Sequence, residues 1–319
     1  FPAEAGSYTL PPETTIDGGG HLIVFESQLG FELDNAQALI LDNGRGLFID
    51  ALNPRANENE LSSGRFPDGA DNRIVFAEAT PGRPNRHSPR TDIVINEIMY
   101  HPADDAGGEF IELLNRSGET VNLSGWTFTR GIDFEFPEGT TIGPGEYLVL
   151  AREPPLAQEH YGIDGVLGPW EGGLSNTAET VLLRDRNGNP ADRVRYADEG
   201  SYPETPDGEG PSLELINPGI ENRYGPAWRA SEEQGTPGRF NSNSQPDPDP
   251  IIAGIRHHPV TPTADESVRV LASVSDEREL RGVTLTWEVD GDNDSRETIA
   301  MVDDGEGDDG VEGNGIYGA

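Results

Sequence analysis

The chain has 319 residues and a formal net charge of −36 at pH 7, and all its basic residues are arginines. Such an acidic surface repels phosphate backbones and anionic lipid, so we expect neither a nucleic-acid partner nor direct membrane insertion. The 40 glycines and 26 prolines disfavour helix-rich folds, and the absence of cysteine excludes disulfides, thiolate metal sites and a cysteine nucleophile.

The beginning of the chain is repeated further along. LPPETTIDGGGHLIV at residues 10–24 aligns without a gap with FPEGTTIGPGEYLVL at residues 136–150. Both copies close alike, with TPGRPN at residues 80–85 and TPGRFN at residues 236–241. The second copy also has a front half, residues 93 to about 135, which the first copy lacks. We therefore expect residues 1–85 to be a partial domain, cut from a longer protein.

Short apolar runs rich in β-branched, leucine and aromatic residues predict strands, because turn residues bound each run. These runs are residues 22–25, 110–114, 147–150, 180–183 and 268–272. Asn43-Gly44 and Asn187-Gly188 predict tight hairpins whose central residues need positive φ. A short helix is expected near residues 155–161. Short strands at this spacing favour sandwiches over crossover-connected parallel sheets.

Composition shifts divide the chain further. A short linker is expected at residues 86–92, and residues 93–241 hold the complete second copy. Residues 242–250 alternate proline with polar residues, which disfavours helix and sheet alike and predicts a second linker. A third module is expected at residues 251–319, where the sequence stops inside a predicted strand.

Several blocks of the second copy occur together in the order typical of one family. They are Ile-Asn-Glu-Ile at 95–98, Glu-Phe-Ile-Glu-Leu at 109–113 with Asn115, Val-Asn-Leu-Ser-Gly-Trp at 121–126, Tyr-Leu-Val-Leu at 147–150 and Thr-Pro-Gly at 236–238. With these blocks the domain resembles the lamin tail domain. The resemblance implies an all-β chain of tandem immunoglobulin-like β-sandwiches, with a binding, spacing or surface-attachment role and no catalytic or cofactor-binding residues. Lamin tails are linked to nucleic-acid contact, but the charge of −36 argues against that role here.

The third module carries a closing signature that runs from Met301 to Tyr317. With it, residues 251–319 resemble a truncated immunoglobulin-like or fibronectin-like module that accompanies lamin tail domains and CotH-type kinase domains in bacterial secreted proteins. The function expected is a non-catalytic spacer and interaction module of a large exported or cell-surface bacterial protein. Its partner is then a protein, cell-envelope or extracellular ligand. The alternative is an accessory region of a secreted enzyme, such as a CotH-type kinase, whose catalytic domain lies outside this segment.

Few residues suggest a catalytic or metal-binding role. Trp126 follows a Leu-Ser-Gly turn and is expected in a sandwich core. Asn96, Glu97 and Glu112 cluster if the two front strands pair, and a carboxylate pair can supply an acid and a base. A buried hydrogen-bond network is the expected role. The histidines lack zinc-ligand spacing, and there is no Gly-x-Ser-x-Gly elbow.

An acidic, glycine-rich stretch closes the third module. Its oxygen donors suit a calcium ion, since hard cations prefer carboxylate and amide oxygens. The predicted ligands are Asp303, Asp304, Asp308, Asp309 and Asn314, with Asp290, Asp292 and Asp294 as second choice. A solvated acidic loop is the other interpretation, and the sequence leaves both open.

Overall fold

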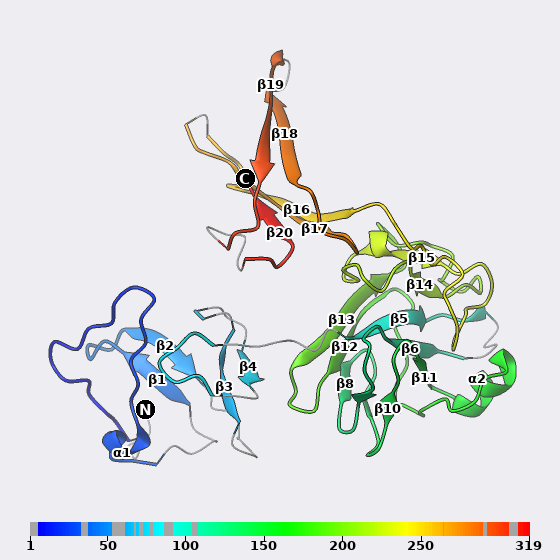
Figure 1. Cartoon of the computed structure of the whole chain (residues 1–319), viewed down its shortest axis with the longest axis horizontal. Coiled ribbons are helices and arrows are strands. Elements are labelled where there is room, and N and C mark those ends of the chain that lie inside the picture. The colour runs from blue at the N-terminus through cyan, green and yellow to red at the C-terminus, as the bar shows by residue number, and fades with distance from the viewer. Residues whose placement is uncertain are drawn as a thin grey trace. The chain divides into compact units, whose positions relative to one another are not determined.

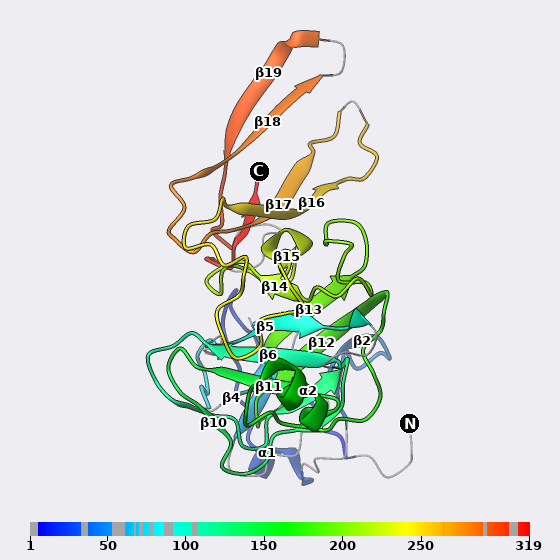
Figure 2. The ribbon, with the colours of Figure 1, turned by 90° about the vertical axis from the view of Figure 1, so that its right-hand side faces the viewer.

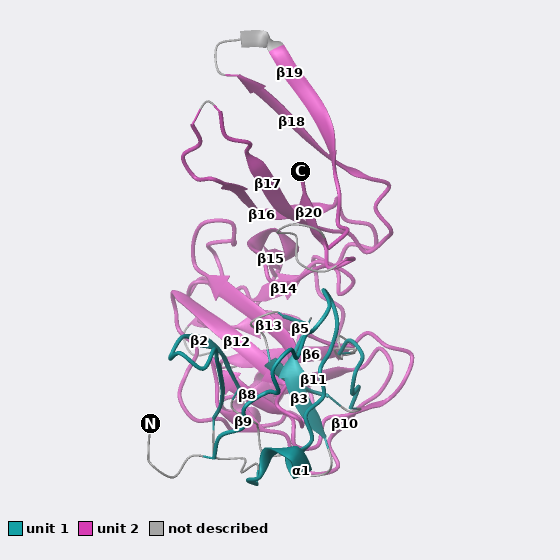
Figure 3. Cartoon of the chain, turned by 90° about the vertical axis from the view of Figure 1, so that its left-hand side faces the viewer, with its two compact units in different colours: residues 1–88 teal, residues 89–319 magenta. Residues whose placement is uncertain are grey.

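The computed structural model describes most of the chain. The described residues are 6–32, 38–52, 61–66, 68–69, 73–76, 79–85, 92–103, 108–263, 265–289, 292–305 and 312–319, and the side chains of 292–294 are not among them. The chain divides into two compact units, Phe1–Ser88 and Pro89–Ala319, called unit 1 and unit 2 (Figure 3). No helix in the described part is long and apolar enough to cross a membrane.

Unit 1 contains two antiparallel strand pairs, β1 with β2 and β3 with β4, and one short helix, α1. Their bounds are α1 (Glu26–Leu29), β1 (Leu39–Asp42), β2 (Phe48–Leu52), β3 (Ser62–Arg65) and β4 (Arg73–Phe76). Within its described residues, the buried apolar side chains are Ile74, Val75 and Phe76 of β4. The part of unit 1 that the structure describes therefore forms only a small core.

Unit 2 begins with two sheets that enclose one core (Figure 1). One has the order β11-β6-β5-β14-β15 and the other the order β13-β12-β8-β9, and β7 pairs with β10. The bounds are β5 (Ile93–Met99), β6 (Phe110–Asn115), β7 (Val121–Asn122), β8 (Thr127–Arg130), β9 (Phe134–Glu135), β10 (Thr141–Ile142), β11 (Tyr147–Ala151), β12 (Ala178–Arg184), β13 (Pro190–Ala197), β14 (Leu213–Leu215) and β15 (Trp228–Ala230). Trp126 lies in the shared core at 3% exposure, as predicted.

Two short helices accompany the sandwich. The predicted helix forms as α2 (Pro154–Tyr161) and ends at Gly162, whose φ of 67° is the left-handed conformation typical of a helix C-terminus. A 3-10 turn, η2 (Gly225–Ala227), precedes β15. The chain is otherwise built of strands and loops, so the predicted all-β class of immunoglobulin-like sandwich type is confirmed.

The last part of unit 2 contains two small sheets, β16-β17-β20 and β18-β19 (Figure 2). Their bounds are β16 (Ile251–His258), β17 (Arg269–Ser275), β18 (Val283–Val289), β19 (Asp292–Met301) and β20 (Ile316–Gly318). A small core forms around Ala272, Val274 and Met301. The domain boundaries inferred from the sequence stay predictions.

Both hairpins expected from Asn43-Gly44 and Asn187-Gly188 form, between β1 and β2 and between β12 and β13. The expected tight turn is wrong, because each loop holds five residues, 43–47 and 185–189. The glycines have positive φ of 70° and 78°, but neither asparagine does. Side-chain oxygens of the first loop residue close both loops by accepting backbone N–H groups, so the copies share one hairpin design.

The hairpins β3–β4 and β14–β15 also correspond. In unit 1 Ser63 lies opposite Val75, and in unit 2 Leu213 lies opposite Ala230. Each is followed by the Thr-Pro-Gly turn. In these hairpins the repeat seen in the sequence is therefore also a repeat of structure.

The asparagine that ends each closing turn is held alike. Asn85 Nδ2 donates to Arg65 O at 2.9 Å, and Asn241 Nδ2 donates to Leu215 O at 2.8 Å. Arg65 ends β3 as Leu215 ends β14. The closing turn therefore attaches at the same place in both copies.

The strand predicted at residues 22–25 is absent, since this segment is irregular and leads into α1. Its counterpart in the second copy is β11, which pairs along its length with β6. The first copy has no sequence matching β6. An apolar run without a neighbouring strand leaves its backbone groups unpaired, which explains the failed prediction.

Candidate functional site

Three glutamates lie side by side in the sheet of unit 2. Glu112 on β6 is opposite Glu97 on β5, and Glu97 is opposite Glu214 on β14. Directly opposed residues project from the same face of a sheet. All three side chains are fully buried. We call Glu97, Glu112 and Glu214 the carboxylate cluster.

Residues 235–243, the closing segment, lie over this cluster and provide most of its donors. Thr236 donates to Glu97 Oε1 from its backbone N at 2.8 Å. Gly238 N donates to Glu112 Oε2 at 2.5 Å. The backbone and hydroxyl of Ser242 donate to Glu214 at 3.0 and 2.8 Å. The cluster therefore ties the end of the domain to its central strands.

Further donors come from the strands themselves. Ser212 Oγ donates to Glu97 Oε1 at 2.5 Å, and Asn96 Nδ2 donates to Glu112 Oε1 at 2.8 Å. Asn96 and Asn241 also bond to each other, with Asn96 Nδ2 donating to Asn241 Oδ1 at 2.9 Å. The hydrogen-bond network expected of Asn96, Glu97 and Glu112 is therefore present.

Burial controls the protonation of the cluster. It raises the pKa of Glu97 to about 7, against the donors that favour the charged form and with help from the neighbouring charge of Glu214. Burial also raises the pKa of Glu112 well above its ordinary value, and the charge of Glu97 adds to that effect. In the described residues no arginine forms an ion pair with the cluster, so the neutral forms of Glu97 and Glu112 are favoured.

The geometry of Thr236 independently indicates a proton on the cluster. Its hydroxyl oxygen lies 2.7 Å from Glu214 Oε1 and 3.2 Å from Glu97 Oε2. A hydroxyl has one hydrogen and can donate to only one of them. If Thr236 donates to Glu214, the Glu97 oxygen must carry a proton and donate to Thr236. In that arrangement Glu97 is protonated and bonds to Thr236, and Thr236 bonds to Glu214.

The sequence did not reveal Glu214, Ser212 or Thr236 as members of the network. Glu214 lies in the run Ser-Leu-Glu-Leu, whose alternation is equally typical of a strand with one solvent face. The Thr-Pro-Gly block indicated where the domain ends, but it did not indicate which groups Thr236 bonds. The acid–base alternative needs access to substrate, and these carboxyl oxygens are buried against the domain's own donors.

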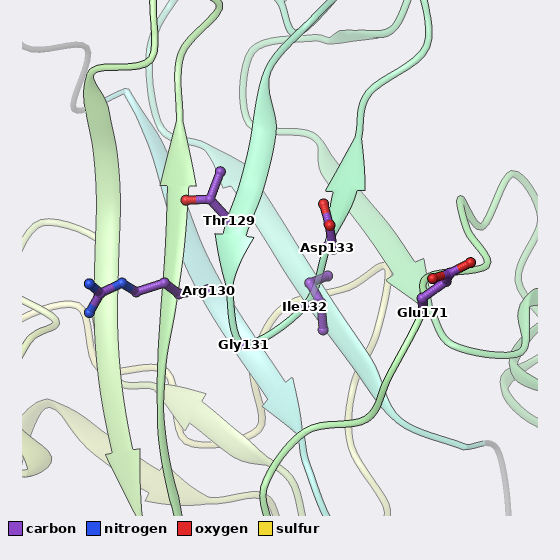
Figure 4. Close-up of a pocket in the computed structure, with 6 residues that line it drawn as sticks. All are labelled: Thr129, Arg130, Gly131, Ile132, Asp133 and Glu171. Carbon is purple, nitrogen blue, oxygen red and sulfur yellow. The ribbon is translucent and has the colours of Figure 1, made fainter.

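A surface hollow lies at the turn between β8 and β9, with a volume of about 410 Å³. Thr129, Arg130, Gly131, Ile132, Asp133 and Glu171 line it. Figure 4 shows Asp133 and Glu171 on one side and the Arg130 side chain directed away from them. Two exposed carboxylates beside an open hollow provide neither an enclosed site nor a set of catalytic groups.

A second hollow, of about 220 Å³, includes Asp192 and Asn222 in its lining. Asp192 Oδ2 accepts from Ile95 N at 2.6 Å and from Asn222 Nδ2 at 2.8 Å. Burial raises the pKa of Asp192 to about 6 despite these donors. The carboxyl group ties β13 to β5 and to the loop before β15.

The predicted calcium ligands are only partly visible. Asp308, Asp309 and Asp290 lie outside the described residues, as do the side chains of Asp292 and Asp294. Asp303 accepts from three backbone N–H groups, at Gly313, Asn314 and Gly315, at 2.9, 3.2 and 2.8 Å. Asp304 is exposed. In the part of the chain that the structure describes, no three candidate ligands gather, and calcium binding stays a prediction.

Comparison with protein families gives one match. Residues 86–198 match the family model described as Lamin Tail Domain. This family is an immunoglobulin-like, non-catalytic sandwich module, so the resemblance seen in the sequence is confirmed for this part of the chain. A search of curated proteins found no match. The matched residues include Glu97 and Glu112, and the closing segment lies beyond them.

Proposed function

We propose that this chain is a non-catalytic spacer and interaction segment of a large exported or cell-surface bacterial protein. The match of residues 86–198 to the lamin tail domain is the observation that carries the proposal. The partner is a protein, cell-envelope or extracellular ligand. The charge of −36 disfavours nucleic acid and anionic membrane surfaces as partners.

The carboxylate cluster fits this function as a structural element. Glu97 and Glu112 are fully buried and accept hydrogen bonds from the domain's own residues. A general acid or base has to reach substrate within hydrogen-bond distance. The cluster instead fastens the closing segment, and a fastened end suits a module that joins neighbours in a longer chain.

Deletion from the parent protein tests the proposal. Bacteria would produce the parent with and without residues 1–319, and both forms would be followed by surface labelling and cell fractionation. The parent should be found outside the cell, and the deletion should lower its retention at the surface while any catalytic rate it has changes less than twofold. A cytoplasmic parent would contradict the proposal. So would hydrolysis or phosphotransfer by the purified chain that Glu97→Gln or Glu112→Gln abolishes.

A second candidate function is the accessory region of a secreted enzyme whose catalytic domain lies elsewhere in the parent. The closing signature of residues 301–317 supports it, because of its resemblance to modules found beside CotH-type kinase domains. The same deletion distinguishes the two. An accessory region should change the parent's KM or kcat by more than tenfold, whereas a spacer should not.

A further inference from the structure

Three exposed arginines lie together on the outer face of the four-stranded sheet of unit 2. They are Arg130 at the end of β8, and Arg193 and Arg195 on β13. Val194 and Tyr196, which alternate with the two arginines of β13, are buried in the shared core. Since successive side chains of a strand point to opposite faces, Arg193 and Arg195 point outward. We call Arg130, Arg193 and Arg195 the arginine patch.

Leu182 on β12 lies in the middle of the patch. It is directly opposite Arg193 on one side and Arg130 on the other, so these three side chains project from the same face. Leu182 is only 6% exposed, although it is not part of the shared core. Such burial is expected where the stems of arginines cover an apolar neighbour. The patch is therefore a packed surface with its charged groups toward solvent.

The positive charges of the patch lack acidic partners. Within the described residues, none of its three arginines forms an ion pair. The Arg130 side chain is directed away from Asp133 and Glu171 (Figure 4). In the next row of the same face, Arg184 and Glu135 lie on either side of Thr127, so that row adds no net charge. Uncompensated positive charge on one face of a chain of net charge −36 favours an anionic partner.

The spacing of the patch fits an extended peptide. Arg193 and Arg195 are two residues apart on one strand, which places them about 6.8 Å apart. Alternate residues of an extended peptide have the same spacing, so carboxylates at alternate positions can face both arginines. Each guanidinium group can then donate two parallel N–H bonds to one carboxylate.

The acidity of the remaining surface favours a short segment over a long polyanion. At physiological ionic strength charges act over about 8 Å. A short acidic segment on the patch therefore interacts mainly with the arginines. DNA or a charged polysaccharide would continue from the patch onto the acidic remainder of the chain, which repels it.

We propose that the arginine patch binds a short, extended segment of a partner protein that carries carboxylates at alternate positions. Two of these carboxylates pair with Arg193 and Arg195. Arg130, two strands away at about 9–10 Å, adds to the attraction. This inference rests on the proposed interaction role of the chain and names the chemistry of the partner.

Two peptides of equal charge and composition test the spacing. The first alternates glutamate with threonine over eight residues, and the second has the same residues in the order Glu-Glu-Thr-Thr, repeated. Both carry a neutral fluorophore, and their binding to the full chain is followed by fluorescence anisotropy. The alternating peptide should bind about fivefold more tightly, since the second peptide loses one of the two ion pairs when it is extended. The affinity should fall as sodium chloride is added.

Variants of the full chain test the patch itself. Arg193→Gln with Arg195→Gln should weaken binding of the alternating peptide about tenfold, since each exposed ion pair contributes up to about fivefold in affinity. Glutamine keeps much of the apolar stem over Leu182, so the loss reports the charge rather than the packing. Arg256→Gln with Arg281→Gln is the matched control, because both arginines are exposed in unit 2 and lie outside the four-stranded sheet. This variant has the same net charge and should bind as the wild type does.

Three results would overturn the inference: no binding of the alternating peptide at millimolar concentration, equal affinities for the two peptides, or equal losses in the two double variants. Tighter binding of heparin or single-stranded DNA would assign the patch to a different polyanion. Self-association seen in sedimentation, and abolished by Arg193→Gln with Arg195→Gln, would assign it to a second copy. The proposed function fails separately, because a cytoplasmic parent would leave peptide binding by the purified chain unchanged.

Discussion

The hydroxyl group of Thr236 lies between two buried carboxyl groups, at 2.7 Å from Glu214 and 3.2 Å from Glu97. Its single hydrogen can satisfy one of them, so the other contact is favourable only when that carboxyl group carries a proton, and burial favours the proton on Glu97. The backbone N of the same residue donates to Glu97 Oε1. One residue therefore connects two strands to the closing segment.

Substitution of Glu97 tests this arrangement. Glu97→Gln should keep the free energy of unfolding of unit 2 within about 1 kcal/mol at pH 5, because its amide N–H can donate to Thr236 as the protonated carboxyl does. Glu97→Ala should lower it by about 2–4 kcal/mol, since it leaves Ser212 Oγ and Thr236 N without an acceptor in a buried site. Urea unfolding followed by tryptophan fluorescence measures both, as all four tryptophans lie in unit 2. Equal losses of unfolding free energy for the two variants would show that the hydrogen bonds of Glu97 do not stabilise unit 2.

Sequence reasoning recovered part of this site. Asn96, Glu97 and Glu112 were recognised because pairing of the two front strands brings them together. Glu214 did not stand out, because its strand alternates and a solvent-facing glutamate would look the same. Which face of a short strand is covered depends on the closing segment, and its contacts span more than 100 residues of sequence.

At the scale of elements, the closing segment crosses the central strands and bonds to their carboxyl groups. Gly235 begins it with a φ of 104°, and a Cβ there would lie 2.8 Å from Glu97 Oε1 and 3.2 Å from Phe110 Cζ. Both the backbone conformation and the close approach require glycine. The closing segment can therefore approach the carboxyl groups because its first residue, Gly235, has no side chain.

Gly235→Ala should lower the free energy of unfolding of unit 2 by about 3 kcal/mol, from strained backbone and lost contacts together. Gly172→Ala is the matched control, because Gly172 has a similar φ of 88° with open space around it, and should cost about 1 kcal/mol. Denaturant unfolding of both variants measures the difference. Equal losses of stability in the two variants would mean that the close approach of Gly235 to Glu97 does not contribute to the stability of unit 2.

The failed strand at residues 22–25 shows where element prediction stops. The same apolar pattern forms β11 in unit 2, where β6 lies beside it, and stays irregular in unit 1. A strand needs a neighbour for its backbone groups, and a local pattern cannot supply that information. The hairpins at residues 43–47 and 185–189 were predictable because their loops close on themselves.

At the scale of the whole molecule, residues 251–319, which the sequence predicts to be a third module, have a small described core and an acidic closing stretch. The predicted calcium site uses Asp303, Asp304, Asp308, Asp309 and Asn314. Calcium at about a hundredfold excess over Kd should stabilise the module by about 2.7 kcal/mol and raise its Tm, with magnesium doing less. Calorimetry of the full chain with calcium, magnesium or chelator measures this. A shift no larger than sodium chloride gives at equal ionic strength, or one that survives D304A with D309A, would mean a solvated loop.

The carboxylate cluster, with Glu97 protonated, closes the sandwich of unit 2. Burial raises the pKa of Glu97 from its ordinary 4.5 to about 7, so its stabilising contribution is complete below about pH 4.5 and is lost as pH rises through about 7. Glu112 and Asp192 titrate in the same direction, so the wild type has to be compared with Glu97→Gln, which keeps both groups.

The most direct measurement is therefore the free energy of unfolding of unit 2 for both proteins from pH 4.5 to 9, followed by tryptophan fluorescence. Between these limits the wild type should lose about 3 kcal/mol more than Glu97→Gln, which is the value of the shift in the pKa of Glu97. Parallel pH profiles for the two proteins, or a wild type that gains stability relative to the variant as pH rises, would contradict the account.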